Sequence, residues 1–190
     1  LYIPFFNIEI VGIPWVIYMI FAAFVMVGTV NAVNLTDGID GLATGVTIPV
    51  MIFYVAVSAW YGKSDLVTVS AAMAGGLSAF LIYNFHPAKV FMGDTGSLFL
   101  GGAVAALAFA FDMPLVLIPV GIIYILETLS DIIQVGYFKA THGKRFFKMA
   151  PLHHHLERCG WSEVKIVTVF VSVTAVFCLL AYYGIRGRYL

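Results

Sequence analysis

Long apolar stretches separated by short polar segments dominate the sequence. A helix needs about 20 apolar residues to cross the hydrocarbon core of a bilayer. Six stretches reach or approach that length: residues 11–33, 42–61, 66–85, 97–111, 114–138 and 164–185. None shows the alternation of apolar and polar positions in segments of about ten residues that membrane barrel strands show. The pattern therefore predicts an all-α, polytopic membrane helix bundle with about six transmembrane helices.

The segments between these stretches alternate in character. Residues 61–65 and 112–114 are short, whereas residues 34–41, 86–96 and 139–161 are polar and hold most of the chemically reactive side chains. The three polar connections follow the first, third and fifth stretches. If all six stretches span the membrane, the three polar connections lie on the same side of it.

Positive charge predicts which side this is, because Lys and Arg are enriched in cytoplasmic connections. The polar connections contain Lys89, Lys139, Lys144, Arg145, Lys148 and Arg158. The opposite side would hold Lys63, Arg186 and Arg188. The difference predicts that the polar connections face the cytoplasm.

Composition agrees with a membrane protein. The chain is 62% hydrophobic and 11% charged, whereas a soluble domain is nearer half apolar and a quarter charged. The formal net charge of zero supplies no general attraction for nucleic acid. We expect residues 1–190 to form a single transmembrane domain. The chain begins at Leu1 rather than Met, without a recognisable targeting segment, so we expect it to be part of a longer membrane protein.

Two Asp-Gly pairs follow the first apolar stretch, in the sequence NAVNLTDGIDGLATG at residues 31–45. Asp37 and Asp40 are each followed by glycine, which is typical of a turn. Asn31 and Asn34 precede them, and amide and carboxylate oxygens also suit a hard cation or the polar edge of a sugar or base. The spacing lacks the closing Glu of an EF-hand. A turn and a binding segment both remain open.

Asp94 lies just before the fourth apolar stretch, between Gly93 and Thr95. One interpretation is helix capping, in which Asp94, Thr95 or Ser97 accepts a hydrogen bond from a free backbone N–H. The other is that Asp94 binds Mg²⁺ beside a phosphate ester at the helix N-terminus. The segment does not contain the GxxxxGK[ST] pattern of a Walker phosphate loop.

Three polar side chains interrupt the fifth apolar stretch. Glu127, Asp131 and Gln134 are four and three residues apart, which places them on one face of a helix. Charged side chains within a membrane are costly and usually face a bundle interior or a wet cavity. A structural contact and a functional role are equally compatible with Glu127 and Asp131.

Consecutive histidines occupy positions 153–155. Neighbouring residues point about 100° apart on a helix, so a regular helix cannot direct all three at one ion. The spacing of zinc ligands in zincins and zinc fingers is absent. With Lys144, Arg145 and Lys148 nearby, the segment could receive an anionic ligand or contact anionic lipid headgroups.

Residues 31–45, 84–102 and 127–163 closely resemble the phospho-N-acetylmuramoyl-pentapeptide transferase family, within the polyprenyl-phosphate N-acetylhexosamine-1-phosphate transferase superfamily. The sequences NAVNLTDGIDGLATG and MGDTGSL are typical of the superfamily. APLHHHLERCGWSE separates this family from relatives that use N-acetylglucosamine phosphate. The resemblance implies a bacterial plasma-membrane enzyme of about ten helices, of which this chain corresponds to the last six.

The implied reaction is Mg²⁺-dependent. It transfers phospho-MurNAc-pentapeptide from UDP-MurNAc-pentapeptide to undecaprenyl phosphate, producing UMP and lipid I for peptidoglycan, on the cytoplasmic face. A homodimer is compatible with the resemblance. Two alternatives stay open: a related transferase of N-acetylglucosamine phosphate, and a transporter with Glu127 and Asp131 as its sites near the bilayer midplane.

The resemblance also implies roles for individual residues. Asp94, Asp37 and His153 would be catalytic, with Asp94 binding Mg²⁺. The substrate-binding residues would be Asn34, Leu35, Gly38, Asn84, Phe91, Ser97, Gln134, His154 and His155, with Phe91 stacking near the uracil. Two departures are evident: a further aspartate pair and a lysine of the family are absent from this chain, and Asp131 stands where the family leads us to expect an aliphatic residue.

Overall fold

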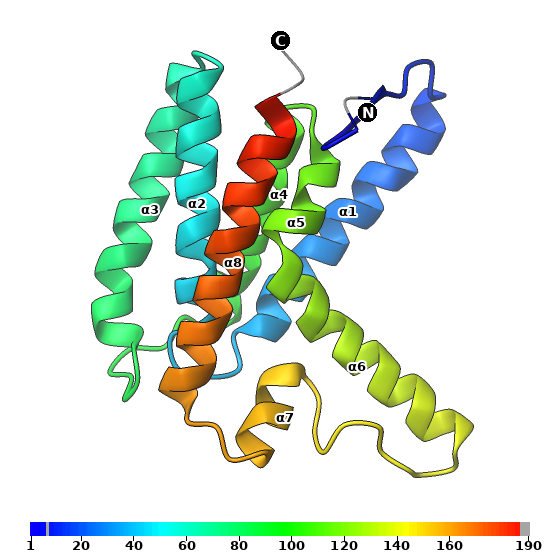
Figure 1. Cartoon of the computed structure of the whole chain (residues 1–190), viewed down its shortest axis with the longest axis vertical. Coiled ribbons are helices and arrows are strands. Elements are labelled where there is room, and N and C mark those ends of the chain that lie inside the picture. Colours follow the sequence, from blue (N-terminus) through cyan, green and yellow to red (C-terminus); the bar gives the residue numbers. More distant parts are fainter. Residues whose placement is uncertain (7, 187–190) are drawn as a thin grey trace.

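The structure is a computed structural model that describes residues 1–6 and 8–186. Long helices dominate it, and a short two-stranded antiparallel hairpin lies near the N-terminus (Figure 1). The strands are β1 (Tyr2–Ile3) and β2 (Ile8–Glu9). The helical elements are α1 (Trp15–Thr36), α2 (Leu42–Trp60), α3 (Ser64–Asn84), α4 (Gly93–Ala110), the 3₁₀ helix η1 (Pro114–Val116), α5 (Leu117–Val120), α6 (Ile122–Ala140), α7 (Leu152–Arg158) and α8 (Glu163–Ile185).

The helix α2 forms the centre of the bundle. In its most apolar stretch 67% of the residues are buried, against 11% in α1 and in α3. It packs between α3 and α8, while α1 pairs with α4 (Figure 1). A Cβ atom on Gly101 of α4 would stand 2.6 Å from Cα of Val30 in α1, so only glycine allows these helices to approach so closely.

The membrane-spanning pattern is largely as predicted. Within the described residues, five helices are long and apolar enough to cross a membrane: α1, α2, α3, α4 and α8. An all-α polytopic bundle is therefore confirmed. Apolar side chains on the outward faces of α1 and α3 remain exposed, which suits a surface surrounded by lipid rather than water.

The expectation of one continuous helix over residues 114–138 is wrong. The chain bends by 82° between Pro114–Val120 and Ile122–Ala140. Pro119 lacks a backbone N–H to continue the helix. At Gly121 a Cβ atom would stand 2.6 Å from the carbonyl oxygen of Leu117. The fifth apolar stretch is thus a broken span of two helical segments. The second segment, α6, diverges from the bundle toward the lower end of the molecule (Figure 1).

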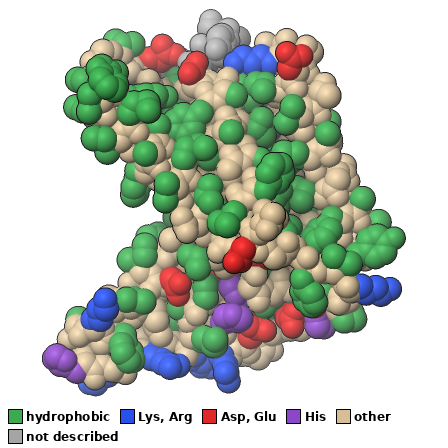
Figure 2. Space-filling model, turned by 180° about the vertical axis from the view of Figure 1, so that it is seen from behind, with side chains coloured by type: hydrophobic (Ala, Val, Ile, Leu, Met, Phe, Trp, Pro, Cys, Tyr) green, Lys and Arg blue, Asp and Glu red, His purple; other side chains and the backbone are tan. Residues whose placement is uncertain are grey.

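The three polar connections meet at one end of the bundle, as predicted. This end holds the C-terminal ends of α1, α3 and α6, the N-terminal ends of α4 and α8, and the whole of α7 (Figure 1). Figure 2 shows His side chains among Asp and Glu at this end, with hydrophobic side chains covering the region above. That this end faces the cytoplasm stays a prediction.

The opposite end carries the N-terminal hairpin and two of the three basic residues expected there. The backbone N–H of Phe5 donates to the carbonyl of Gly184 in α8, at 3.0 Å. Lys63 donates to the carbonyl of Ala110 at 2.9 Å, and Arg186 lies over the ring of Trp60. Arg188 lies outside the described residues.

Candidate active site

The end of α1 and the start of α4 meet through Asn34. Its Nδ2 donates to Oδ1 of Asp94 at 3.1 Å and to Oγ of Ser97 at 2.9 Å. Asn34 lies in the last turns of α1, and Asp37 is the residue at which that helix ends. Asp94 lies in the first turn of α4. The two helix ends therefore bring together residues about 60 positions apart, so that Asn34, Asp37, Asp94 and Ser97 lie close to one another.

Two carboxylates dominate this site. Partial burial raises the pKa of Asp37 above its usual value, and the nearby negative charge of Asp94 raises this pKa further. Such a pair favours a cation that neutralises the repulsion, and carboxylate oxygens are the ligands that Mg²⁺ prefers. The donor atoms of Asp37 and Asp94 therefore fit the predicted Mg²⁺.

The alternative interpretation of Asp94 as a helix cap is wrong. The α4 N-cap position is Met92, and no side chain accepts a capping hydrogen bond there. Thr95 does not take this role either, and Ser97 donates its hydroxyl proton toward the carbonyls of Gly93 and Asp94 instead. The Asp94 carboxylate is exposed and has only the amide of Asn34 as a hydrogen-bond donor among the described residues.

Glu127 and His153 form a buried pair. Oε2 of Glu127 lies 2.8 Å from Nδ1 of His153, and Oε1 accepts a hydrogen bond from the backbone N–H of His153 at 3.2 Å. Both side chains are almost completely buried, at 0% and 1% exposure. An ionised carboxylate can only accept, so this contact places a proton on Nδ1. Burial without a partner would be costly for either group, and each satisfies the other.

The other ring nitrogen of His153 points toward the turn after α1. Its Nε2 is buried and lacks a hydrogen-bond partner among the described residues. A Cβ atom on Gly38 would stand 2.2 Å from this nitrogen. The pair thus runs from Glu127 of α6, through His153 of α7, to the residue that follows Asp37. It connects the broken span to the acidic site.

The other two histidines have different surroundings. Nδ1 of His154 contacts Oε2 of Glu157, one turn later in α7. Nδ1 of His155 accepts the backbone N–H of Lys148 at 3.1 Å. Consistent with their directions on a helix, the three side chains do not meet at one point. Only His153 is placed beside Gly38, while His154 and His155 support α7 and the segment before it.

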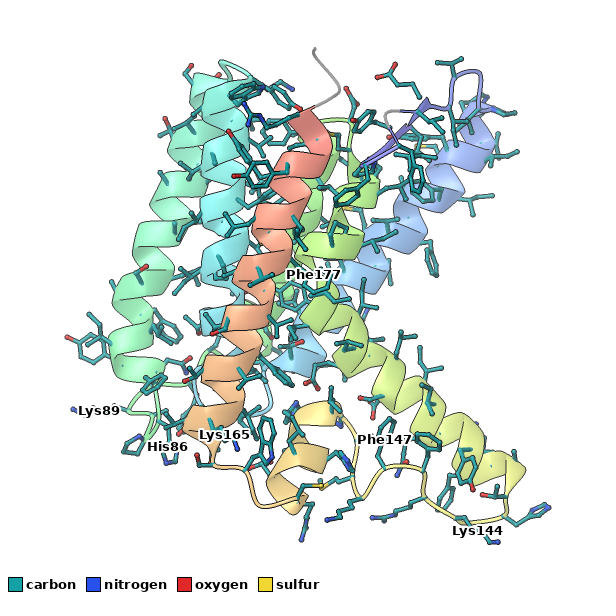
Figure 3. All side chains as sticks on the ribbon, in the orientation of Figure 1. His86, Lys89, Lys144, Phe147, Lys165 and Phe177 are labelled. Carbon is teal, nitrogen blue, oxygen red and sulfur yellow. The ribbon has the colours of Figure 1, made fainter. Side chains whose placement is uncertain are left out.

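A second polar cluster joins three segments at the same end of the bundle. Nδ1 of His86 lies 3.2 Å from Oδ2 of Asp40 and 3.2 Å from Oε2 of Glu163. Asp40 also accepts the backbone N–H of Ala88 at 2.9 Å. Figure 3 shows His86 near the end of α3, beside the lower end of α8. The ligand atoms lie within 4.8 Å of one another, which is compatible with a bound cation or with a charged imidazole between two carboxylates.

The turn between α1 and α2 depends on a second glycine. Gly41 has φ of 75° and precedes the first residue of α2. A side chain at this left-handed conformation would be strained. The positive φ thus allows Asp40 to face His86 while α2 begins immediately afterwards. The Asp-Gly pairs therefore form the turn between α1 and α2, and they also position polar side chains at this end of the bundle.

Asn84 is the last residue of α3, and Phe91 lies in the connection from α3 to α4 that leads to Asp94. The amide of Asn84 is buried, accepting from Thr44 at 2.7 Å and donating to the carbonyl of Val90 at 3.0 Å. It fixes the connection that leads to Asp94. The ring of Phe91 is 74% exposed and lines a crevice between α3 and α4. Leu35 lies half-buried in the last turn of α1.

Gln134 uses its whole amide to hold the segment after α6. Its Oε1 accepts the backbone N–H groups of Phe146 and Phe147, at 3.1 and 2.9 Å, and its Nε2 donates to the carbonyl of Phe147 at 3.1 Å. The resemblance implies that Gln134 contacts the nucleotide. Here it contacts the backbone, so that role stays a prediction.

Three residues of these clusters received no role from the motifs. Glu127 signalled itself as a carboxylate in an apolar stretch, but its partner is 26 residues away. His86 and Glu163 lie within segments that resemble the family, yet only the folded chain shows their contacts. His86 contacts the side chains of Asp40 and Glu163, and Glu163 accepts the backbone N–H of Asp40. Sequence spacing cannot show such pairs, because they depend on how the helix ends meet.

Comparisons with known proteins agree with these features. The family model described as glycosyl transferase family 4 matches residues 1–112. A protein of Clostridium perfringens named phospho-N-acetylmuramoyl-pentapeptide-transferase is 55% identical over 95% of this chain and 56% of its own length. Proteins with the same name are 52% identical in Clostridium acetobutylicum, over 95% and 56%, and 48% identical in Acetivibrio thermocellus, over 98% and 57%. The chain spans about half the length of the curated relatives it matches.

Proposed function

The chain belongs to glycosyl transferase family 4, and we propose that it is the C-terminal part of a bacterial multi-pass membrane enzyme of about ten helices. The proposed reaction transfers phospho-MurNAc-pentapeptide from UDP-MurNAc-pentapeptide to undecaprenyl phosphate, releasing UMP and forming lipid I. The similarity to relatives named for this transferase supports the proposal. The observation that carries it is the meeting of Asn34, Asp37, Asp94 and His153 at one end of a helix bundle.

The residues would share the work as follows. Mg²⁺ held by Asp94 and Asp37 would neutralise charge on the pyrophosphate and on the leaving UMP. Asn34 would keep the Asp94 carboxylate in place through its hydrogen bond. When protonated on both ring nitrogens, His153 would donate its Nε2–H to a phosphate oxygen, while Glu127 accepts the Nδ1–H and fixes the orientation of the ring. Such transfer depends mainly on positioning and on charge stabilisation.

The acceptor lipid would reach the site along an apolar groove beside the broken span. The groove has a volume of about 410 Å³ and lies between α1 and the α5–α6 pair. Its walls include Phe21 and Gly28 of α1 and Tyr124 and Ile132 of α6. An isoprenoid chain suits such a surface, because an apolar groove can take it up without burying an unpaired polar group. The end of the groove at Ala32 would then lie toward the acidic site, because Ala32 precedes Asn34 by two residues in α1.

The two alternatives have less support. The comparisons favour the muramoyl-peptide branch over a transferase of N-acetylglucosamine phosphate, since the relatives carry the former name. A transporter should place its polar groups near the middle of the membrane. The polar clusters described here gather at one end of the bundle instead. We further propose that this end faces the cytoplasm, because one substrate is a soluble nucleotide. Assembly as a homodimer stays a prediction.

The direct test is a substrate comparison in the full-length enzyme that contains this chain. Membranes holding the enzyme, Mg²⁺ and undecaprenyl phosphate should release UMP from UDP-MurNAc-pentapeptide and not from UDP-N-acetylglucosamine. Turnover of the second donor alone would favour the related transferase. The 190-residue chain alone should be inactive, because the resemblance puts a further aspartate pair outside it. Robust UMP release by the isolated chain would contradict that part of the proposal.

A further inference from the structure

A separate basic cavity lies between α6 and the segment that leads to α7. Its volume is about 460 Å³, and α6 supplies one wall through Asp131, Gln134, Val135, Phe138 and Lys139. Arg145, Met149 and Ala150 supply the opposite wall, and Arg158 of α7 completes it. We call this cavity the basic pocket. None of these residues belongs to the acidic site around Asp37 and Asp94.

The net positive charge of the residues that line the basic pocket favours an anionic ligand. Lys139, Arg145 and Arg158 line it together with a single carboxylate, that of Asp131. Within residues 1–6 and 8–186, none of these three cations forms an ion pair or donates a side-chain hydrogen bond. Two of them are arginines, whose planar guanidinium groups bind carboxylates through paired hydrogen bonds. The cations are therefore available to a ligand.

The walls of the basic pocket are held in place. Gln134 fixes the backbone of Phe146 and Phe147 through three hydrogen bonds. Lys148 donates its Nζ to the carbonyl of Arg158 at 3.1 Å, which ties the segment to α7. Figure 3 shows Phe147 on this segment, between α6 and α7. The backbone segments that form the walls of the basic pocket are thus held in place by hydrogen bonds.

Its distance from the reacting centre fits a particular part of the donor. From Glu127, which contacts His153, to Val135 in the pocket wall, α6 advances by about 12 Å at 1.5 Å per residue. An extended peptide covers that distance with about four residues at 3.3 Å each. The sugar of the donor lies between the pyrophosphate and the peptide and covers part of this distance, so a donor with its pyrophosphate beside His153 could place the first residues of its peptide in the basic pocket.

We propose that the basic pocket binds carboxylates of the donor's peptide, and so selects donors by their peptide chain. The proposal rests on the proposed function, because it takes the donor to be a nucleotide sugar that carries a peptide. Arg145 and Arg158 bind a carboxylate, and the aliphatic part of the peptide packs on Val135, Phe138 and Met149. Asp131 then lies where a peptide amino group or N–H would meet it, which gives this residue a role.

The test compares two donors in the full-length enzyme. Dissociation constants are measured for UDP-MurNAc-pentapeptide and for UDP-MurNAc, which lacks the peptide. The variant is the double substitution Arg145→Gln and Arg158→Gln. We expect the constant for the peptide-bearing donor to rise about tenfold or more, because two charge-assisted contacts are lost. The constant for UDP-MurNAc should stay unchanged. Lys144→Gln is the matched control, since this exposed cation neighbours the pocket without lining it.

Each other outcome has a clear meaning. Equal weakening of both donors, or no weakening of either, overturns the proposal. A change confined to the KM for undecaprenyl phosphate, or to binding of vesicles containing phosphatidylglycerol, would assign the basic pocket to a lipid phosphate and also overturn it. Arg145→Lys with Arg158→Lys keeps the charge and should restore part of the affinity, which controls for misfolding. Failure of the wild-type enzyme to bind UDP-MurNAc-pentapeptide would instead refute the proposed function.

Discussion

Nε2 of His153 lies so close to Gly38 that a Cβ atom there would stand 2.2 Å away from it. The glycine is needed for packing and not for a left-handed backbone, because its φ is not in the positive range. The turn after α1 therefore carries two kinds of glycine. Gly41 serves the backbone conformation, and Gly38 makes room for the imidazole. Through this contact the position of the His153 ring depends on a residue without a side chain.

We therefore expect Gly38→Ala to displace His153 and abolish most of the activity. Overpacking of this kind typically costs about 1–3 kcal/mol of folding free energy. UMP release and thermal unfolding of the full-length enzyme in detergent measure the two effects. Gly136→Ala is the control, since a Cβ atom there meets nothing within 4 Å and alanine favours a helix. Normal activity in Gly38→Ala would show that His153 does not need its present position.

Glu127→Gln tests whether the buried carboxylate positions His153. The substitution keeps the shape and removes the charge that holds the Nδ1 proton. A hydrogen bond to a charged group contributes about 1.5–3 kcal/mol. If this contribution is lost from the transition state, kcat should fall about tenfold to a hundredfold. The KM for either substrate should change little. Asp65→Asn, a carboxylate in the first turn of α3 at the opposite end, is the control. An unchanged kcat would contradict the positioning role.

The sequence predicted most of the fold, because hydrophobic length reports directly on membrane crossing. Five of the six predicted stretches became single helices, with ends within a few residues. The break at Gly121 was missed, since hydropathy is insensitive to helix direction and Pro119 and Gly121 sit inside an otherwise apolar stretch. Proline and glycine indicate where a helix can break. Only the structure shows that it does break at Gly121, where a Cβ atom would collide with the carbonyl oxygen of Leu117.

The candidate site divides in the same way. Asp37 and Asp94 were identified by motif resemblance, and the grouping with Asn34 follows once the helix ends share one side of the membrane. The pairing of Glu127 with His153 could not be predicted, because it depends on the bend that brings α6 toward α7. The cap interpretation of Asp94 failed because the helix begins one residue before it, at Gly93. Asp94 would be the N-cap only if the helix began two residues later, at Thr95.

Asp94→Asn should abolish Mg²⁺-dependent turnover while the fold stays intact. An amide keeps the shape and can still meet Asn34, but it lacks the charge that binds a hard cation. No capping bond is lost, since Asp94 does not cap α4. UMP release should fall by a hundredfold or more, an estimate of about 2.7 kcal/mol in barrier height. Near-normal turnover with an unchanged Mg²⁺ requirement would rule out the ligand assignment.

The pH dependence of Mg²⁺-free protein tests the interaction of Asp37 with Asp94. Burial first, and Asp94 second, raise the pKa of Asp37 in the folded state. A group with a raised folded-state pKa stabilises the fold below its unfolded pKa, which is about 3.9 for Asp. That contribution is lost as the pH rises through the folded-state pKa.

Asp94→Asn removes only the second cause. The variant should therefore lower the pKa of Asp37 part of the way toward its usual value, and the loss of stability with rising pH should become smaller. Unfolding midpoints in detergent with a chelator, measured from acid to neutral pH for wild type and variant, provide the comparison. An unchanged or steeper pH dependence in Asp94→Asn would show that the two carboxylates do not interact.

His153→Ala should weaken transfer from UDP-MurNAc-pentapeptide without loss of bound zinc. His153 is paired with Glu127, while His154 and His155 contact Glu157 and the backbone of Lys148, so the three do not form a closed set of metal ligands. The ligand atoms that do approach one another belong to Asp40, His86 and Glu163. Measuring the bound metal in purified wild-type, His153→Ala and His86→Ala enzymes shows whether a metal binds at the three histidines or at the cluster of Asp40, His86 and Glu163. If stoichiometric zinc were present and disappeared in His153→Ala alone, the histidines would be a metal site and the anionic assignment would be wrong.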